Sequence, residues 1–264
     1  MSIISLTTDM GTRDYYVGML KGAILSLNPE AKIVDLSHDV KPFYIPEAAY
    51  IIKHAYKAFP KGTVHLISVN PEVSEDVQFV AVKMDDQYFI GADNGMFSMI
   101  FEKEVDEVFS LENVTSSNIT FPSRDVFVTA ATHLSKGGTM EVLGKKLNGV
   151  MQRPLLAPVT HGTGTIQGSV VHIDRYENAI TNITEEMFKS FGKGRPFEIC
   201  FHRTRDNIRK ISSSYNQVSM GEKLALFGCT GFLEIAQNQG NAASLLGLAI
   251  NHVVRIEFHD RKIG

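Results

Sequence analysis

The chain has 264 residues, of which 44% are hydrophobic and 21% are charged, and its formal net charge is −3. This composition is typical of a globular protein, and the small negative charge argues against nucleic acid as a partner. The two cysteines, Cys200 and Cys229, are too few for a disulfide scaffold or for a zinc site of their own. We find no apolar run of about 18 residues and no signal peptide, so we expect a cytoplasmic protein without a membrane partner.

Strands and helices are predicted to alternate through the first part of the chain, residues 1–155. The predicted strands are Ile3–Leu6, Lys32–Leu36, Val64–Val69, Phe79–Lys83 and Tyr88–Ile90, and the predicted helices are Tyr15–Leu27, Ile45–Phe59 and Arg124–Leu134. This alternation indicates an α/β domain with a mainly parallel sheet. Such sheets bind ligands beyond the carboxyl ends of their strands, where Asp9 and Asn70 fall.

The pattern changes after Pro154 and Pro158, where β-rich runs are separated by polar turns that contain glycine. These runs are Thr163–Ile173, Phe197–His202, Leu224–Phe227 and Val253–Phe258. Residues 156–264 are therefore predicted to form a smaller, mostly antiparallel β domain.

Standard catalytic and metal-binding motifs are absent from the sequence. There is no phosphate-binding loop, no dinucleotide fingerprint, no nucleophile elbow and no histidine pair at metal-ligand spacing, so we predict no metal site. The loop acids Asp9, Asp14 and Asp174 could bind a ribose diol or a ligand ammonium, although a loop aspartate more often caps a helix or forms a turn. The residues by themselves predict a loop-lined pocket and no particular reaction.

Several segments, taken in order, resemble one family. They are Thr8–Gly11 with Asp14, Tyr16–Gly22, Ile33–His38, Gly91–Gly95, Thr120–Asp125, Ile173–Asn178 and Gly231–Ala243. Their joint order, over nearly the whole chain, resembles the S-adenosyl-L-methionine (SAM) hydroxide adenosyltransferase family, whose relatives include the fluorinase and the chlorinase. The resemblance implies a homotrimer that binds SAM between the N-terminal domain of one subunit and the C-terminal domain of the next, with no cofactor besides this substrate.

The resemblance also implies which residues would bind the sugar and the methionine of SAM. Asp9 would hold the two ribose hydroxyls through charge-assisted hydrogen bonds. Asp14 and Asp174 would face the methionine, and Asp174 would pair with its ammonium group. Cys229 and Thr230 lie in the turn that receives the methionine carboxylate in relatives.

A second group of residues would bind the adenine, again as the resemblance implies. Asn178 and the backbone around Gln237 and Gln239 would read the edge of the base. Tyr176 and Tyr215 would flank its two faces, where stacking contributes about 1 kcal/mol.

Three positions depart from the family pattern. Hydrolysing members carry an Asp, an Arg and a His that position and polarise the attacking water, whereas this chain has Asn70, Val77 and Pro122 there. Halide-using relatives have a tyrosine at the Asn70 position, and Ser123 matches a serine that contacts halide in the fluorinase. None of the three replacements can ionise, so the motifs support binding of SAM more strongly than they support its hydrolysis.

Three hypotheses follow from this pattern. The first is an enzyme that cleaves SAM to adenosine and L-methionine by attack of water or hydroxide at C5′, slowed by the three replacements. The second is a non-catalytic protein that senses or sequesters SAM or adenosine. The third is a halide-dependent adenosyl transferase.

Overall fold

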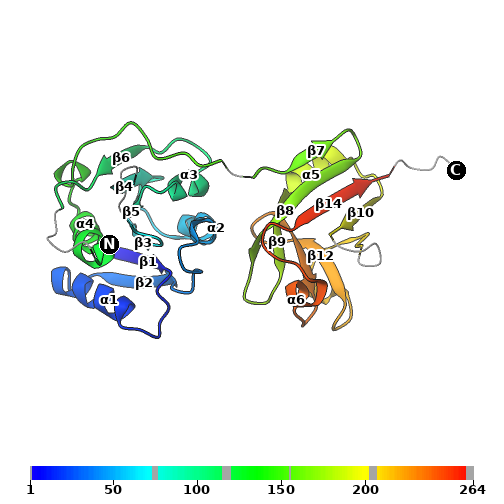
Figure 1. Ribbon diagram of the computed structural model, residues 1–264, viewed down its shortest axis with the longest axis horizontal. Helices are drawn as coiled ribbons and strands as arrows, with labels where there is room; N and C mark the ends of the chain where they lie inside the picture. The colour runs from blue at the N-terminus through cyan, green and yellow to red at the C-terminus, as the bar shows by residue number, and fades with distance from the viewer. Residues whose placement is uncertain (1, 73–76, 115–119, 155, 202–206, 260–264) are drawn as a thin grey trace. The chain divides into compact units, whose positions relative to one another are not determined.

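The computed structural model describes residues 2–72, 77–114, 120–154, 156–201 and 207–259. The chain divides into two compact units, residues 1–154 and 155–264 (Figure 1). Over the described residues, the first unit contains a six-stranded sheet and the second an eight-stranded sheet. The predicted fold class, an α/β domain followed by a smaller β domain, is confirmed.

The elements of the first unit alternate along the chain. Its strands are β1 (Ile3–Thr8), β2 (Lys32–Ser37), β3 (Val64–Ser68), β4 (Phe79–Met84), β5 (Gln87–Ala92) and β6 (Glu107–Ser110). Its helices are α1 (Tyr16–Leu27), α2 (Ile45–Ala55), α3 (Met96–Ile100) and α4 (Val128–Ser135), with short turns of helix at Tyr56–Ala58, Ser123–Phe127 and Met140–Val142. The predicted strands and long helices are present, with ends that differ by a few residues.

The order of the strands creates a switch point beside β1. The order in the sheet is β2-β1-β3-β5-β4-β6, and the first four strands are parallel while β4 runs antiparallel to both of its neighbours. The chain leaves β1 toward β2 and returns to β3 on the opposite side of β1. In open α/β sheets, the crevice at the carboxyl ends of two such strands is the usual ligand site.

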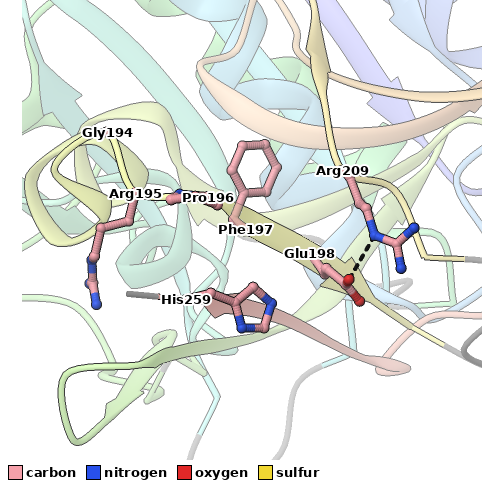
Figure 2. Close-up of a pocket in the computed structure, with 7 residues that line it drawn as sticks. All are labelled: Gly194, Arg195, Pro196, Phe197, Glu198, Arg209 and His259. Atoms are coloured by element: carbon pink, nitrogen blue, oxygen red, sulfur yellow. Dashed lines mark hydrogen bonds and ion pairs between the residues drawn. The ribbon is translucent and has the colours of Figure 1, made fainter. Parts of the chain in front are cut away.

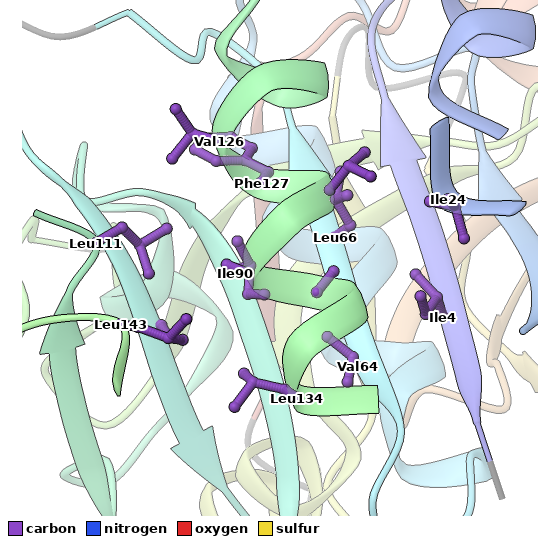
Figure 3. Packing of buried hydrophobic residues seen from close by; sticks show 14 of the residues in the cluster. Ile4, Ile24, Val64, Leu66, Ile90, Leu111, Val126, Phe127, Leu134 and Leu143 are labelled. Atoms are coloured by element: carbon purple, nitrogen blue, oxygen red, sulfur yellow. The ribbon is translucent and has the colours of Figure 1, made fainter. Parts of the chain in front are cut away.

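Helices cover both faces of this sheet. On one face, Leu20 and Ile24 of α1 pack with Leu134 of α4 and with Phe127 of the turn before it, against Ile4 and the neighbouring strands (Figure 3). On the other face, buried residues of α2 and α3 pack against the side chains that alternate with these along the strands. Each fully buried Leu or Ile contributes about 1.5–3 kcal/mol of transfer free energy, so the sheet is a rigid base for the loops at its edge.

Two predicted helices differ from the observed ones at their ends. The predicted helix Ile45–Phe59 is α-helical only to Ala55, and a tighter helical turn, Tyr56–Ala58, follows it. The predicted helix Arg124–Leu134 begins with a π-helical turn, Ser123–Phe127, in which the Val128 N–H donates to the Ser123 carbonyl. Pro122 fixes the backbone just before this turn, and the wider turn brings the Ser123 side chain to the end of β3.

The second unit is a curled antiparallel sheet. Its strands are β7 (Val159–His161), β8 (Thr165–Ile173), β9 (Ala179–Thr184), β10 (Phe197–Cys200), β11 (Ile211–Ser212), β12 (Lys223–Phe227), β13 (Phe232–Gln237) and β14 (Val253–Phe258). They pair in the order β10-β14-β8-β9-β13-β12-β11, with β7 also on β8, and only the short β11 runs parallel to its neighbour within the described residues. The predicted strand Phe197–His202 is observed as far as Cys200, and His202 lies outside the described residues.

Two short helices belong to this unit, α5 (Glu185–Gly192) and α6 (Ala242–Leu246). Helix α5 begins at Thr184, whose hydroxyl accepts a hydrogen bond from the Met187 N–H at 3.1 Å. Glu185 and Glu186 in its first turn interact favourably with the helix dipole. The helix thereby leaves β9 at a defined point and covers the sheet beside Ile183 and Phe258.

Candidate functional site

Asp9 lies at the switch point of the first unit, directly after β1. Its Oδ2 atom accepts hydrogen bonds from the backbone N–H groups of Phe43, at 2.9 Å, and Asn70, at 3.4 Å. Its own N–H donates to the Ser68 carbonyl at 3.4 Å. The carboxylate thus joins the loops that follow β1, β2 and β3, and Oδ1 has no hydrogen-bond partner among the described residues.

Phe43 is a candidate site residue that the sequence did not indicate. It has a φ of 64°, a left-handed backbone that costs a non-glycine residue free energy, and its side chain is 68% exposed. The bond from its N–H to Asp9 helps to hold this conformation, and strained, exposed residues of this kind occur often at functional sites. The available signal was an aromatic residue in a polar loop directly after the Ile33–His38 motif.

The turn at Asn70 lies beside Asp9 at the end of β3. Asn70 has a φ of 47°, which asparagine tolerates better than most residues. The Asn94 amide donates to the carbonyls of Val69, at 3.5 Å, and Asn70, at 3.3 Å, and so fixes the turn from the loop after β5. Asn94 belongs to the Gly91–Gly95 motif, for which the sequence suggested no role.

Ser123 is fully buried, and its hydroxyl is hydrogen-bonded to the hydroxyl of Ser68. The bond brings Ser123 to the same end of the sheet as Asp9. Val77 is half-buried and Pro122 is buried. Neither side chain can ionise. Asp14 is exposed in the loop between β1 and α1.

The turn between β8 and β9 contains Asp174. Its Oδ1 accepts hydrogen bonds from the N–H groups of Tyr176, at 2.9 Å, and Asn178, at 2.8 Å, and its Oδ2 accepts from the Asn178 side-chain amide at 2.9 Å. Asp174 therefore organises this turn, the structural role that a loop aspartate most often has. Asn178 is buried, and Tyr176 is 75% exposed.

This turn is joined to the C-terminal motif Gly231–Ala243 through Glu177. The Glu177 carboxylate accepts hydrogen bonds from the Ser244 N–H at 3.0 Å and the Asn241 amide at 3.2 Å, and hydrogen bonds from Ser244 and Asn241 hold its pKa below the usual range. Its carbonyl accepts from the Ala243 N–H at 2.9 Å. Two motifs far apart in the sequence are thus brought together.

Glu234, in the middle of β13, is a second residue that the sequence analysis missed. It is only 6% exposed, and its Oε2 accepts a hydrogen bond from the Tyr215 hydroxyl at 2.8 Å. Burial and the nearby charge of Asp174 raise the pKa of Glu234, although the bond from Tyr215 opposes the rise. Burial and the Glu234 carboxylate also raise the pKa of Tyr215. A side chain at Gly228 would overlap the Glu234 carboxyl, so this glycine makes room for it.

The remaining predicted residues of the second unit lie at the two ends of β13 and in the turns beside it. Cys229 is exposed, and the Thr230 hydroxyl is buried without a hydrogen-bond partner in the part of the chain that the structure describes. On the other side, the Gln237 amide donates to the Gly221 carbonyl at 2.8 Å, and Gln239 has a φ of 52°. A side chain at Gly240 would overlap that of Gln237, so the second turn also depends on glycine.

A hollow of about 470 Å³ lies elsewhere on the second unit, lined by Gly194–Glu198 with Arg209 and His259 (Figure 2). Its charged groups are engaged with one another or with the backbone. The Arg209 guanidinium contacts Glu198 at 2.6 Å, and the Arg195 guanidinium donates to the Gly192 and Phe191 carbonyls. The hollow includes none of the predicted site residues.

The described residues contain no group of three or more His, Cys, Asp or Glu side chains that could hold a metal ion. None of the described helices is long and apolar enough to cross a membrane.

The fold and the candidate site define a two-domain protein with an α/β unit, a β unit and loop acids in both. The chain belongs to the SAM hydroxide adenosyltransferase family, since the family's N-terminal domain matches residues 4–144 and its C-terminal domain matches residues 168–255. The resemblance inferred from the motifs is confirmed.

Individual relatives match over almost their full length. A protein of Methanocaldococcus jannaschii named (R)-S-adenosyl-L-methionine hydrolase is 30% identical over 261 residues, which are 94% of this chain and 93% of the relative. A fluorinase of Actinopolyspora mzabensis is 25% identical, with 96% of each chain covered. The crystal structure of an uncharacterized conserved protein from Thermotoga maritima has a TM-score of 0.87 at 30% identity and covers 96% of this chain and 99% of that one.

Proposed function

We propose that this protein binds SAM and cleaves it to adenosine and L-methionine by attack of water or hydroxide at C5′. Membership of the family supports the proposal, as does the name of the relative from Methanocaldococcus jannaschii. The observation that carries it is the geometry of Asp9. One carboxylate oxygen is held by two backbone donors at the switch point, and the other has no partner among the described residues.

In this proposal, Asp9 accepts hydrogen bonds from the two ribose hydroxyls. Backbone donors fix its carboxylate before the ligand arrives, so little conformational entropy is lost on binding. The exposed ring of Phe43 covers the sugar beside it, because its backbone is bonded to the same carboxylate. Asn70, whose N–H donates to Asp9, directs its side chain to the reacting carbon.

The second unit binds the adenine and the methionine. Asp174 keeps its turn and adds an ionic interaction with the methionine ammonium, since a carboxylate has about four acceptor positions and three are used. Tyr215 stacks on the base while its hydroxyl remains on Glu234. The unpaired Thr230 hydroxyl and the neighbouring Cys229 accommodate the methionine carboxylate.

The reaction needs little covalent chemistry from the protein. The oxygen of water forms a bond to C5′ as the bond from C5′ to sulfur breaks, methionine leaves as a neutral thioether, and the water loses a proton to solvent. The protein contributes alignment and exclusion of other water. Because Asn70, Val77 and Pro122 cannot ionise, we expect the deprotonation step to lack general-base help, which contributes about 10²–10⁴-fold in other enzymes.

A second function is favoured by the same three residues. A chain without an ionisable group at these positions can bind SAM or adenosine and release it unchanged, as a sensor or a sequestering protein does. Halide-dependent transfer has less support, because the Ser123 hydroxyl is buried and bonded to Ser68.

One experiment separates the three functions. The protein is incubated with SAM, with and without chloride, and adenosine, methionine and halogenated nucleoside are separated by chromatography. Adenosine with an equal amount of methionine supports hydrolysis, and a chloride-dependent nucleoside product supports halide transfer. Tight binding of SAM in calorimetry with no product supports the sensor. Absence of both binding and product excludes all three.

Assembly, location and cofactor use belong to the same proposal. We propose a cytoplasmic homotrimer that needs no cofactor besides its substrate and whose site combines groups from both units. Light scattering at micromolar concentration tests the trimer, and a monomer mass there would refute it. Dilution through the assembly constant should weaken ligand binding if the site needs more than one subunit.

A further inference from the structure

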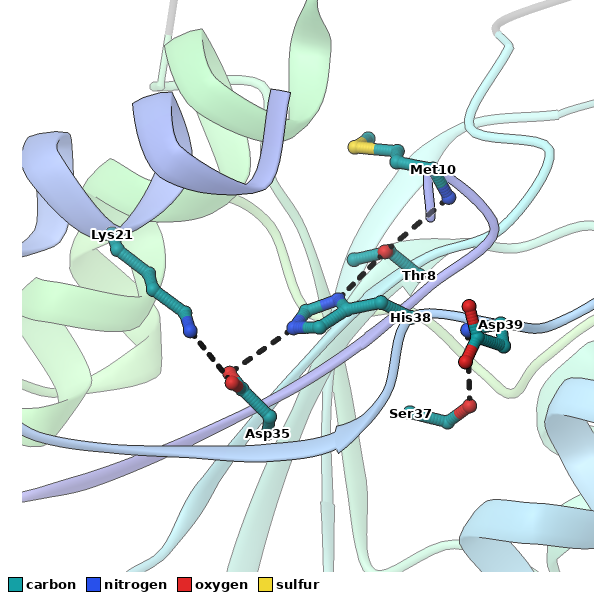
Figure 4. A network of polar contacts seen from close by, with 7 residues as sticks. All are labelled: Thr8, Met10, Lys21, Asp35, Ser37, His38 and Asp39. Carbon is teal, nitrogen blue, oxygen red and sulfur yellow. Dashed lines mark hydrogen bonds and ion pairs between the residues drawn. The ribbon is translucent and has the colours of Figure 1, made fainter. Parts of the chain in front are cut away.

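A chain of hydrogen bonds and ion pairs leads from the surface to the loop that contains Asp9. Lys21 of α1 contacts Asp35 of β2 at 2.6 Å, and the Asp35 Oδ1 lies 3.1 Å from the Nε2 of His38, within ion-pair distance but without hydrogen-bond geometry (Figure 4). The Nδ1 of His38 is hydrogen-bonded to the Thr8 hydroxyl at 2.9 Å. Thr8 is fully buried and directly precedes Asp9.

The directions of these hydrogen bonds follow from the donors available. The Thr8 hydroxyl oxygen accepts the Met10 N–H at 3.4 Å, so its one hydrogen is free to donate to the Nδ1 of His38. The imidazole then carries its proton on Nε2, which faces Asp35. The Asp35–His38–Thr8 chain therefore ends on the backbone N–H of the residue that follows Asp9.

His38 also holds the loop through its backbone. Its carbonyl accepts a hydrogen bond from the Gly11 N–H at 2.8 Å, and Gly11 has a φ of 64°, a conformation that glycine adopts without strain. The ring and the carbonyl of His38 thus fix the loop on both sides of Met10. The loop departs from β1 at an angle that these contacts set.

We propose that the Asp35–His38–Thr8 chain positions the Asp9 loop for ligand binding, with Thr8 and His38 as positioning residues. The inference rests on the proposed function, because it concerns how Asp9 is oriented toward the ribose. Without the Thr8 hydroxyl, the Met10 N–H loses its acceptor and His38 loses its donor. The loop then samples other orientations, and the fraction of molecules that can bind falls.

The structure contains a matched control on the same strand. The Ser5 hydroxyl is hydrogen-bonded to the Nδ1 of His65 at 2.6 Å, and both residues are buried. The pair has the same chemistry as Thr8 and His38, but it lies in the middle of β1, away from the Asp9 loop. Loss of either hydroxyl should lower stability, whereas only loss of the Thr8 hydroxyl should alter binding.

The experiment compares Thr8→Val, Thr8→Ser and Ser5→Ala with the wild type. Titration calorimetry with adenosine gives the dissociation constant, and thermal unfolding without ligand gives the stability of each variant. We expect Thr8→Val to raise the dissociation constant about tenfold, because a buried donor and an acceptor lose their partner. Thr8→Ser keeps the hydroxyl and should stay within about twofold of the wild type. Ser5→Ala should lower the unfolding temperature and leave the dissociation constant within about twofold.

A fourth variant decides the question if Thr8→Val does not fold. Asp35→Ala alters a half-exposed residue at the outer end of the chain, where substitutions seldom prevent folding. We expect it to raise the dissociation constant about threefold and to accelerate hydrogen exchange of the Met10 and Gly11 amides. Wild-type affinity and exchange in Asp35→Ala would then refute the proposal.

The remaining outcomes separate this inference from the proposed function. If the wild type binds adenosine and Thr8→Val binds equally well, the Asp35–His38–Thr8 chain is only structural and the inference is wrong. Equal losses of affinity in Thr8→Val and Ser5→Ala would also refute it, because the effect would follow stability. If the wild type binds neither adenosine nor SAM, the proposed function is wrong, and the inference, which depends on it, is wrong as well.

Discussion

Replacement of Asp9 by alanine is expected to weaken adenosine binding about 30-fold. The Oδ2 atom of Asp9 is used by the backbone of Phe43 and Asn70, and Oδ1 remains for the ribose. Loss of hydrogen bonds to a charged acceptor costs about 2 kcal/mol, which corresponds to the 30-fold change. The two backbone donors lie in partly exposed loops where water can replace the carboxylate, so the free energy of unfolding should fall by less than about 1 kcal/mol.

Titration calorimetry with adenosine measures the first quantity, and urea denaturation measures the second. Asp39→Ala is the control, since it removes the same charge from an exposed position four residues before Phe43. Asp9→Asn adds a finer test. Its amide oxygen can still accept from the Phe43 N–H, so stability should be kept while the affinity for the ribose falls. Equal affinity in Asp9→Ala and Asp39→Ala would refute the assignment of Asp9 to the sugar.

Three further predictions concern catalysis, packing and pH. The triple variant Asn70→Asp, Val77→Arg, Pro122→His should hydrolyse SAM at least about 10²-fold faster than the wild type, and by more than the single changes combined; an unchanged rate by chromatography would contradict this. Gly228→Ala should lower the free energy of unfolding by about 1–3 kcal/mol in urea, because its methyl group overlaps a buried carboxyl; wild-type stability would contradict it. Burial lowers the pKa of His65 to about 4, so its contribution to stability is complete above pH 6.5 and is lost as the pH falls toward 4. The free energy of unfolding should therefore be about 2 kcal/mol lower at pH 5 than at neutral pH, and a His65→Asn variant should show a smaller decrease. A midpoint above pH 6 in an NMR titration of the His65 ring would refute this prediction.

The first unit could be predicted from its sequence because its local signals agree with its fold. Helix α1 shows regular apolar spacing and ends at Leu27, and its capping residue Asn28 directly precedes a proline. The buried β1 and β3 are apolar runs bounded by polar loops. With strands and helices in alternation, these signals placed Asp9 and Asn70 at the ligand edge before any contact was known.

The second unit was harder to predict because burial overrides local preference there. Strand β13 has the sequence Phe-Leu-Glu-Ile-Ala-Gln, in which Leu, Glu, Ala and Gln favour helix. It forms a strand because β9 and β12 pair with it on both sides. Strand β9 was not predicted, and α5 was missed although Thr184 and two glutamates mark its start.

The contacts of the candidate site residues could not be predicted from the sequence. Asp9 was a candidate, but its bond to Phe43 spans 34 positions and depends on a left-handed residue that sequence does not indicate. Glu234 was overlooked because an acid inside an apolar strand is normally exposed, and here Tyr215 and a neighbouring glycine allow its burial. Asp174, in contrast, was a candidate from the sequence. The sequence alone could not reveal that its own turn uses both of its carboxylate oxygens.

The π-helical turn before α4 has a consequence for how this protein can tolerate changes in length. The turn Ser123–Phe127 contains one residue more than a regular helical turn would. Deleting one residue after Phe127 would rotate the rest of α4 by about 100° and turn its apolar side chains away from the sheet. A deletion at Arg124 or Asp125, outside the core residues Val126 and Phe127, should instead shorten the turn toward regular helix, keep the core contacts of α4 and break the bond from Ser123 to Ser68. The extra residue thus lets the turn beside the site change in length while α4 keeps its packing against the sheet.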